Sequence, residues 1–278
     1  MRVASRATLG RTMKRRPTSK DLLPLARLGK APGIVPTGEA FRPEWIDFAN
    51  GIRVGNLEPH ERITQILKYN LELRHGTPFV TDRWGRGVFW QWICWLPRAN
   101  REAKPISNGV NFGCAKLFIS IDREKRIFEF GLQVERGYVR DADGASGVRG
   151  TQDARGASGW VLADDWDWQR LMKQCAKGAA LDAELRRLLR EGFIAEMNGG
   201  GEGALSSAAG IRAAARKCPA DEWAGFQLYY PMPEREVRAC TGFELVTAVL
   251  GAFAQVVPVM NMCMQVPLPT KPFPGFRV

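Results

Sequence analysis

Two apolar segments separated by five consecutive charged residues constrain the fold of this chain more than any other feature. Residues 115–121 and 127–134 are apolar runs of strand length, and residues 122–126 between them are all charged. This pattern predicts a β-hairpin with a solvated turn. Alternation along the second run places its phenylalanines on one face and Glu129 on the other. We expect Glu129 to face solvent, because a buried carboxylate would need a cationic partner or a raised pKa.

A third apolar run precedes the hairpin at residues 88–96, where the sequence reads VFWQWICWL between Gly87 and Pro97. Its length and its aromatic and β-branched content favour a strand over a helix. The three runs together predict an antiparallel sheet over residues 88–134.

Helical periodicity and one further strand signal surround this sheet. The predicted helices cover residues 58–73, 166–177, 181–193 and 204–217, and the later strand covers residues 226–230. The order of these elements along the chain predicts an α+β fold, in which an antiparallel sheet of about residues 88–134 plus a later strand is packed by several helices.

The C-terminal region contains a long uncharged segment, residues 245–270. Its length is sufficient to cross a bilayer. However, Pro258 interrupts the run, and polar residues such as Thr247 and Gln255 lie inside it. We therefore predict a buried core helix over residues 243–257, and no membrane partner is favoured.

Composition divides the chain into three parts. Residues 1–21 form a basic tail, residues 22–197 form the main α+β domain, and residues 204–278 form a C-terminal helical segment expected to pack on the same core. The glycine-rich stretch between the last two parts is typical of a flexible hinge.

The net charge of +11 is concentrated at the start of the chain, where residues 1–20 carry seven basic residues and no acidic one. Of the 40 basic residues in the chain, 29 are arginines, and arginine binds phosphate with two parallel hydrogen bonds. The tail therefore predicts a polyanionic partner, although a GC-rich genome would also favour arginine. An arginine-rich, acid-poor start is also typical of mitochondrial targeting. The predicted nucleic-acid contacts in the tail are Arg11, Lys14, Arg15 and Arg16.

Tryptophans and arginines gather around the first predicted strand, with four indoles between residues 84 and 95. Exposed aromatic rings beside guanidinium groups are typical of sites that stack unpaired bases. Alternation predicts that Trp90 and Trp92 share one face of the strand. The competing interpretation is a tryptophan-rich core covered by arginine stems, because a run that is aromatic on both faces is commonly buried on both. The predicted nucleic-acid contacts here are Arg83, Trp84, Arg86, Arg98 and Arg101.

Asp82 and the later triplet Glu102-Ala-Lys104 resemble, in residue type, the metal-dependent nucleases of the PD-(D/E)xK family. The resemblance implies that Asp82 and Glu102 would hold Mg²⁺ and that Lys104 would orient the attacking water. Glu102 follows a polar stretch that reads as a loop rather than as the end of a strand. A solvated charged loop is therefore the favoured interpretation of the same residues.

Other common chemistries lack their sequence signatures. The chain has no dinucleotide-binding or P-loop glycine motif, and neither of its two histidines lies beside a nucleophile pattern. Its six cysteines are scattered without a CxxC pair, which predicts reduced, mostly buried thiols and no zinc site. We expect a cytoplasmic protein, with the mitochondrial matrix as the alternative, and no cofactor except Mg²⁺ in the nuclease case.

Three functions are consistent with the sequence. The first is a nucleic-acid-binding protein that forms part of a larger assembly and uses the basic tail and the Trp/Arg segment. The second is the Mg²⁺-dependent nuclease, and the third is a protein-interaction subunit without catalysis.

Overall fold

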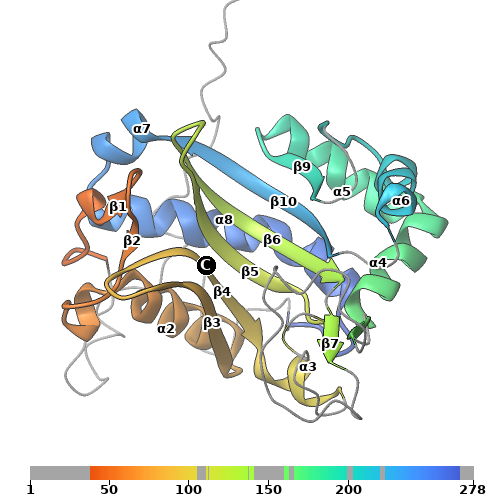
Figure 1. The fold of residues 1–278 in the computed structure, drawn as a ribbon, viewed down its shortest axis with the longest axis horizontal. Coiled ribbons are helices and arrows are strands. Elements are labelled where there is room, and N and C mark those ends of the chain that lie inside the picture. Colours follow the sequence, from red (N-terminus) through yellow and green to blue (C-terminus); the bar gives the residue numbers. More distant parts are fainter. Residues whose placement is uncertain are drawn as a thin grey trace, which may run out of the picture.

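The structure is a computed structural model, and it describes residues 38–104, 111, 113–136, 138–140, 160–162, 166–198, 203–219 and 223–269. It contains an eight-stranded antiparallel sheet packed by helices (Figure 1), which confirms the predicted α+β fold. The predicted tail and the glycine-rich hinge at residues 199–202 lie outside the described residues.

Six strands form the main body of the sheet, and all neighbouring strands are antiparallel. Their spatial order is β3 (Phe79–Arg86), β4 (Phe89–Pro97), β5 (Lys116–Asp122), β6 (Ile127–Arg136), β10 (Ala224–Pro233) and β9 (Ile194–Asn198). A short hairpin of β1 (Ile46–Asp47) and β2 (Gly51–Arg53) pairs with the start of β4. Strands β7 (Tyr138–Arg140) and β8 (Trp160–Leu162) form a separate pair.

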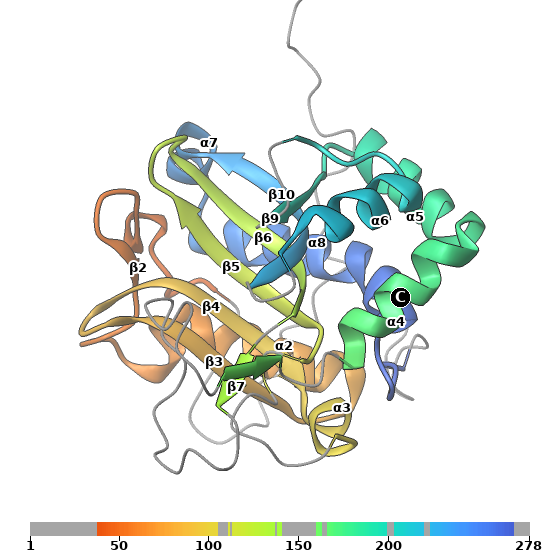
Figure 2. The same cartoon turned by 45° about the vertical axis from the view of Figure 1, so that its right-hand side comes forward.

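Seven α-helices occur among the described residues. They are α2 (Ile63–His75), α3 (Arg98–Glu102), α4 (Trp166–Lys177), α5 (Ala179–Arg190), α6 (Ala208–Lys217), α7 (Glu234–Ala239) and α8 (Gly242–Cys263). Two 3-10 helices, η1 (Pro43–Trp45) and η2 (Pro59–Glu61), complete the set. Figures 1 and 2 both show α4, α5 and α6 gathered at the end of the molecule opposite from the β1–β2 hairpin.

Helix α8 is the central helix of the core. A capping box between Thr241 and Glu244 fixes its first turn. It is long and apolar enough to cross a membrane, but 72% of its most apolar stretch is buried inside the protein, as in the predicted core helix. The prediction that the helix ends before Pro258 is wrong, because α8 continues through that residue to Cys263. A proline inside a helix removes one backbone hydrogen bond and its ring crowds the carbonyl four residues earlier. Burial of Val256, Val257, Val259 and Met260 on both sides of Pro258 offsets this cost.

Alternation along the strands gives the sheet two different faces. One face is apolar and packs against α8, α4 and α2; its members include Leu117, Ile119, Phe128, Phe130 and Leu132. The opposite face, here named the polar face, carries a smaller apolar cluster together with buried polar side chains. The cluster consists of Cys94, Leu96, Cys114, Phe118 and Tyr229, and the polar side chains include Lys116, Glu129, Gln133, Glu135 and Gln227.

The predicted hairpin is present as β5 and β6, with Arg126 in the left-handed conformation at its turn. None of the six cysteines forms a disulfide; five are buried, and Cys240 is intermediate, in agreement with the predicted mostly buried thiols.

Candidate functional site

The β3–β4 hairpin presents the most exposed large apolar side chain among the described residues, Trp84, which is 65% exposed. Trp84 lies on β3, which pairs with β4 alone among the described strands. The indole therefore projects from a strand that is held on one side and open on the other.

Arg83 lies next to Trp84 and stacks on another tryptophan. Its guanidinium carbon is 3.8 Å from the ring centroid of Trp90, within the range of a cation–π contact. The Trp90 indole also donates a hydrogen bond from Nε1 to the Gly87 carbonyl, at 3.2 Å. These contacts restrain the hairpin tip. Because consecutive residues of a strand point to opposite faces, the Arg83 guanidinium lies on the face of Trp90, and the Trp84 indole, which stands opposite Trp92, lies on the other face.

The prediction that Trp90 and Trp92 share one face of the strand is wrong. Between Trp84 and Gly85 on β3, the pairing on β4 advances by two residues instead of one, which is a β-bulge. The extra residue reverses the alternation, so Trp90 packs against the main core and Trp92 packs on the polar face. Trp92 there donates from Nε1 to Gln133 Oε1, at 3.0 Å.

The remaining predicted nucleic-acid contacts lie apart from this tip or outside the described residues. Arg98 is exposed on α3, whereas Arg101 is half-buried and donates from Nε to Asn111 Oδ1, at 2.8 Å. The side chain of Arg86 and the four tail residues Arg11, Lys14, Arg15 and Arg16 lie outside the part of the chain that the structure describes.

The three residues of the nuclease hypothesis have different surroundings. Asp82 accepts a hydrogen bond at Oδ2 from Asn111 Nδ2, at 2.9 Å, and Glu102 is exposed at the end of α3. Lys104 is buried, and its Nζ lies 3.1 Å from Asp167 Oδ1, with both side chains fully buried. It also donates to the Asn100 carbonyl, at 2.8 Å. The charge of Lys104 therefore already has a buried structural partner.

A metal site receives no support from the geometry of the described residues. Among them, no group of three or more His, Cys, Asp or Glu side chains is placed to hold an ion. The pair of Asp82 and Glu102 as Mg²⁺ ligands stays a prediction. Asp167 lies in the first turn of an amphipathic helix, where an acidic side chain is favourable. This position marks the start of the helix in the sequence, but it does not reveal the pairing with Lys104.

The polar face contains a connected network around a buried ion pair between Lys116 and Glu135. Gln133 donates from Nε2 to Glu135 Oε2, at 2.8 Å, and accepts from Gln227 Nε2, at 3.1 Å. Trp223 donates from Nε1 to the same Glu135 oxygen, at 3.0 Å. Burial lowers the pKa of Lys116, but the Glu135 carboxylate more than offsets this, and the net pKa is raised. A nucleophilic lysine needs a lowered pKa, so this network is suited to structure rather than to amine chemistry.

The prediction that Glu129 faces solvent is wrong. Its side chain lies on the polar face, where the residue is 9% exposed and accepts a hydrogen bond from Ser120 Oγ, at 2.7 Å. Because β6 lies between β5 and β10, side chains of both neighbouring strands flank Glu129 on this face. Burial raises the pKa of Glu129 to about 7, against the opposing effect of the Ser120 hydrogen bond. The carboxyl can therefore gain or lose its proton near neutral pH.

Of the acidic groups that raise the pKa of Glu129, Glu196 on β9 has the largest effect. It raises the pKa of Glu129 further and accepts a hydrogen bond from the Tyr229 hydroxyl, at 3.0 Å. A group that titrates near neutral pH can serve in proton transfer. The described groups that influence the pKa of Glu129 are the Ser120 hydroxyl, the carboxyls of Glu196 and Asp122, and the Lys125 ammonium, and no histidine is among them.

No family model, no curated protein and no solved structure matches this chain. The geometry of the described residues is therefore the basis for a functional proposal. Its clearest surface feature is the exposed Trp84 indole on β3, with the exposed Arg83 on the other face of the same strand.

Proposed function

We propose that the protein binds nucleic acid with unpaired bases at the tip of the β3–β4 hairpin. In this proposal, Trp84 stacks on a base, and the basic residues 1–20 supply phosphate contacts without sequence preference. The observation that carries the proposal is the 65% exposure of the Trp84 indole on β3, a strand that pairs on one side only among the described residues.

The surroundings of Trp84 favour a stacking role. Base stacking on an aromatic side chain contributes about 1–3 kcal/mol per base and tolerates any base. The Arg83–Trp90 contact restrains the hairpin before binding, so less conformational freedom is lost when a base arrives. A flat ring on a restrained strand is the geometry that such stacking requires.

The charge distribution supports the second part of the proposal. Seven basic residues without an acidic one precede residue 21, and each phosphate contact releases condensed counterions from the nucleic acid. Binding through this tail should therefore weaken as salt concentration rises, with a slope that depends on the number of contacts.

The proposal is tested by fluorescence anisotropy with labelled single-stranded DNA and RNA oligonucleotides. Trp84→Ala should weaken binding by about 5- to 150-fold, as expected for the loss of one stacked base, and Trp84→Phe should retain most of the affinity. Val266→Ala is the matched control, because Val266 is the other exposed large apolar residue among those described. Equal affinity of Trp84→Ala and the wild type would overturn the stacking role.

The tail is tested separately by deleting residues 1–20. The deletion should lower affinity and flatten its dependence on salt. An unchanged affinity at low salt would remove the tail from the proposal and leave the hairpin tip to be judged by its own variants.

A second candidate function, binding of a protein partner, is favoured by the outer edge of β3. That edge has no strand partner among the described residues, and its backbone groups could pair with an added strand. Co-purification with a partner at fixed stoichiometry, together with no oligonucleotide binding, would favour this function over the first.

A further inference from the structure

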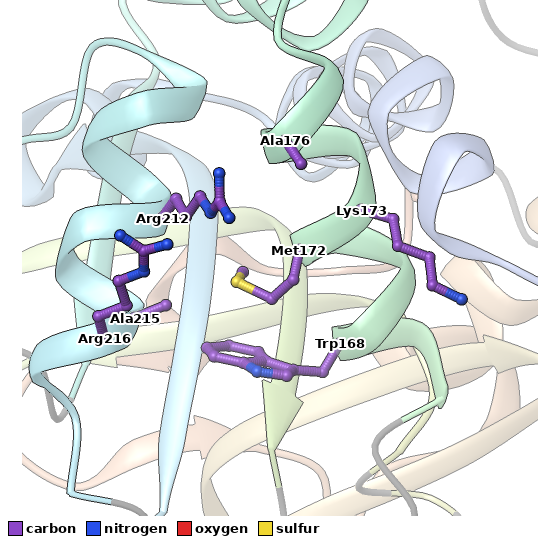
Figure 3. Close-up of a pocket in the computed structure, with 7 residues that line it drawn as sticks. All are labelled: Trp168, Met172, Lys173, Ala176, Arg212, Ala215 and Arg216. Carbon is purple, nitrogen blue, oxygen red and sulfur yellow. The ribbon is translucent and has the colours of Figure 1, made fainter.

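A cavity of about 460 Å³ lies between α4 and α6 (Figure 3). Trp168, Met172 and Ala176 line it from α4, where they follow one another at intervals of four residues, and Ala215 lines it from α6. Residues four apart lie on the same side of a helix. An apolar floor thus runs along one side of α4 and faces α6.

Two arginines border this apolar floor on the α6 side. Arg212 and Arg216 are one helical turn apart, and Figure 3 shows both guanidinium groups on the side of the cavity opposite from α4. Neither forms an ion pair or a side-chain hydrogen bond with another residue in the described part of the chain. Lys173 also lines the cavity, but its side chain extends away from the two arginines (Figure 3).

The described residues that line the cavity are either cationic or uncharged. Of the described residues around the cavity, three are cationic and none is acidic. Two guanidinium groups one turn apart can donate to the same phosphate, because each presents several N–H groups in a planar fork. An occupant of this cavity should therefore be an anion with more than one acceptor oxygen.

The apolar floor of the cavity sets a second requirement for its ligand. Trp168 is only 4% exposed and Met172 is partly buried, so the two side chains pack mainly between the helices and present the rest of their surface to an open groove. A cavity of this volume falls within the range of about 300–1,000 Å³ found for small-molecule sites. A flat or apolar group attached to the anion would fit against this floor.

We propose that the cavity between α4 and α6 binds a small organic phosphate of the nucleoside phosphate class. The phosphate lies between Arg212 and Arg216, and the flat group of the ligand lies against Trp168 and Met172. This site goes beyond the proposed nucleic-acid contact, because α6 packs beside β9 whereas Trp84 lies on β3, at the other edge of the sheet.

The test is isothermal titration calorimetry of the full chain with adenosine monophosphate, and in parallel with inorganic phosphate. We expect saturable binding of the nucleotide and at least about tenfold weaker binding of inorganic phosphate, which lacks the apolar group. The double variant Arg212→Ala/Arg216→Ala should lose at least about tenfold in affinity for the nucleotide, since each arginine provides charged hydrogen bonds.

Arg186→Ala is the matched control. Arg186 is an exposed arginine on α5 that borders a second cavity of about 450 Å³. Binding that is equally weakened by Arg186→Ala, or that is equally strong for inorganic phosphate, would overturn the proposal. So would the absence of heat with adenosine monophosphate at millimolar concentration. Trp84→Ala should leave nucleotide binding unchanged, so this site and the hairpin tip can fail independently.

Discussion

Glu129 is the carboxyl whose replacement tests the electrostatics of the polar face most directly. We consider Glu129→Gln, which keeps the shape of the side chain and retains an oxygen that can accept the Ser120 hydroxyl. The wild-type side chain accepts that hydrogen bond at 2.7 Å while the residue is 9% exposed. The substitution therefore removes a titrating charge with little change in packing.

The expected effect follows from the pKa of Glu129. Burial raises it from 4.5 to about 7; Glu196 and Asp122 raise it as well, while the Ser120 hydrogen bond and Lys125 lower it. Each pKa unit corresponds to about 1.4 kcal/mol, so ionising this buried carboxyl costs about 3 kcal/mol of stability. In the unfolded chain the group ionises near its ordinary pKa. Between the two values the folded chain binds more protons, and stability falls as pH rises.

The variant should therefore gain stability over the wild type as pH increases. The difference should be close to zero at about pH 4, where both states of the wild type are protonated, and should approach about 3 kcal/mol above about pH 8. Urea denaturation at a series of pH values measures it. Glu124→Gln is the control, because Glu124 is an exposed carboxylate at the turn of the same hairpin. Parallel pH profiles for the wild type and Glu129→Gln would refute this reasoning.

Three further predictions concern stability and reactivity. Lys104→Met should destabilise the protein by about 3–5 kcal/mol in urea denaturation, because it leaves the buried Asp167 carboxylate without its cation; an unchanged unfolding midpoint would contradict the structural role of this pair. Gly131→Ala should lower the stability by about 1–3 kcal/mol, because an added Cβ would lie 2.1 Å from the Leu228 carbonyl oxygen of the neighbouring strand; thermal unfolding will show whether the ladder tolerates it. Iodoacetamide should modify Cys240 first under native conditions, since the other five cysteines are buried; mass spectrometry that finds another cysteine modified equally fast would disprove this order.

The strands with strong local signals could be predicted from the sequence. The β5–β6 hairpin has apolar alternation on both sides of a charged turn, and the ends of the observed strands lie within two residues of the predicted ones. Helix α4 was equally clear, because its apolar residues recur at helical spacing. In these segments the local pattern and the tertiary environment agree.

The outer strands could not be predicted because their pairing comes from distant residues. β3 contains charged residues and Gly85 instead of an apolar run, and it becomes a strand through its pairing with β4. β9 has five residues and pairs with β10, which lies about thirty positions later in the chain. The burial of Glu129 depends on β10 and β9, which come much later in the chain. The alternation of its neighbours in sequence therefore indicated a solvent-facing side chain.

The bulge in β4 also depends on residues outside that strand, namely on β3. Gly85 stands opposite the extra residue with a φ of +147°, a conformation that side chains other than glycine rarely adopt. A Cβ at this position would lie 2.6 Å from the Trp90 Cα. The bulge therefore depends on a glycine in one strand and the tryptophan spacing in the other, and alternation within β4 alone cannot reveal it.

The tryptophans of this region differ in whether their indole nitrogens donate a hydrogen bond within the fold. This difference distinguishes the tryptophans that stabilise the fold from the exposed one. Trp90, Trp92 and Trp95 donate to Gly87, Gln133 and Thr64, respectively. Each of these rings is thus tied to the fold, as the core interpretation of the sequence requires. Trp84 has neither such a bond within the described residues nor burial. Its 65% exposure leaves most of the indole accessible, as stacking on a base in the proposed function requires.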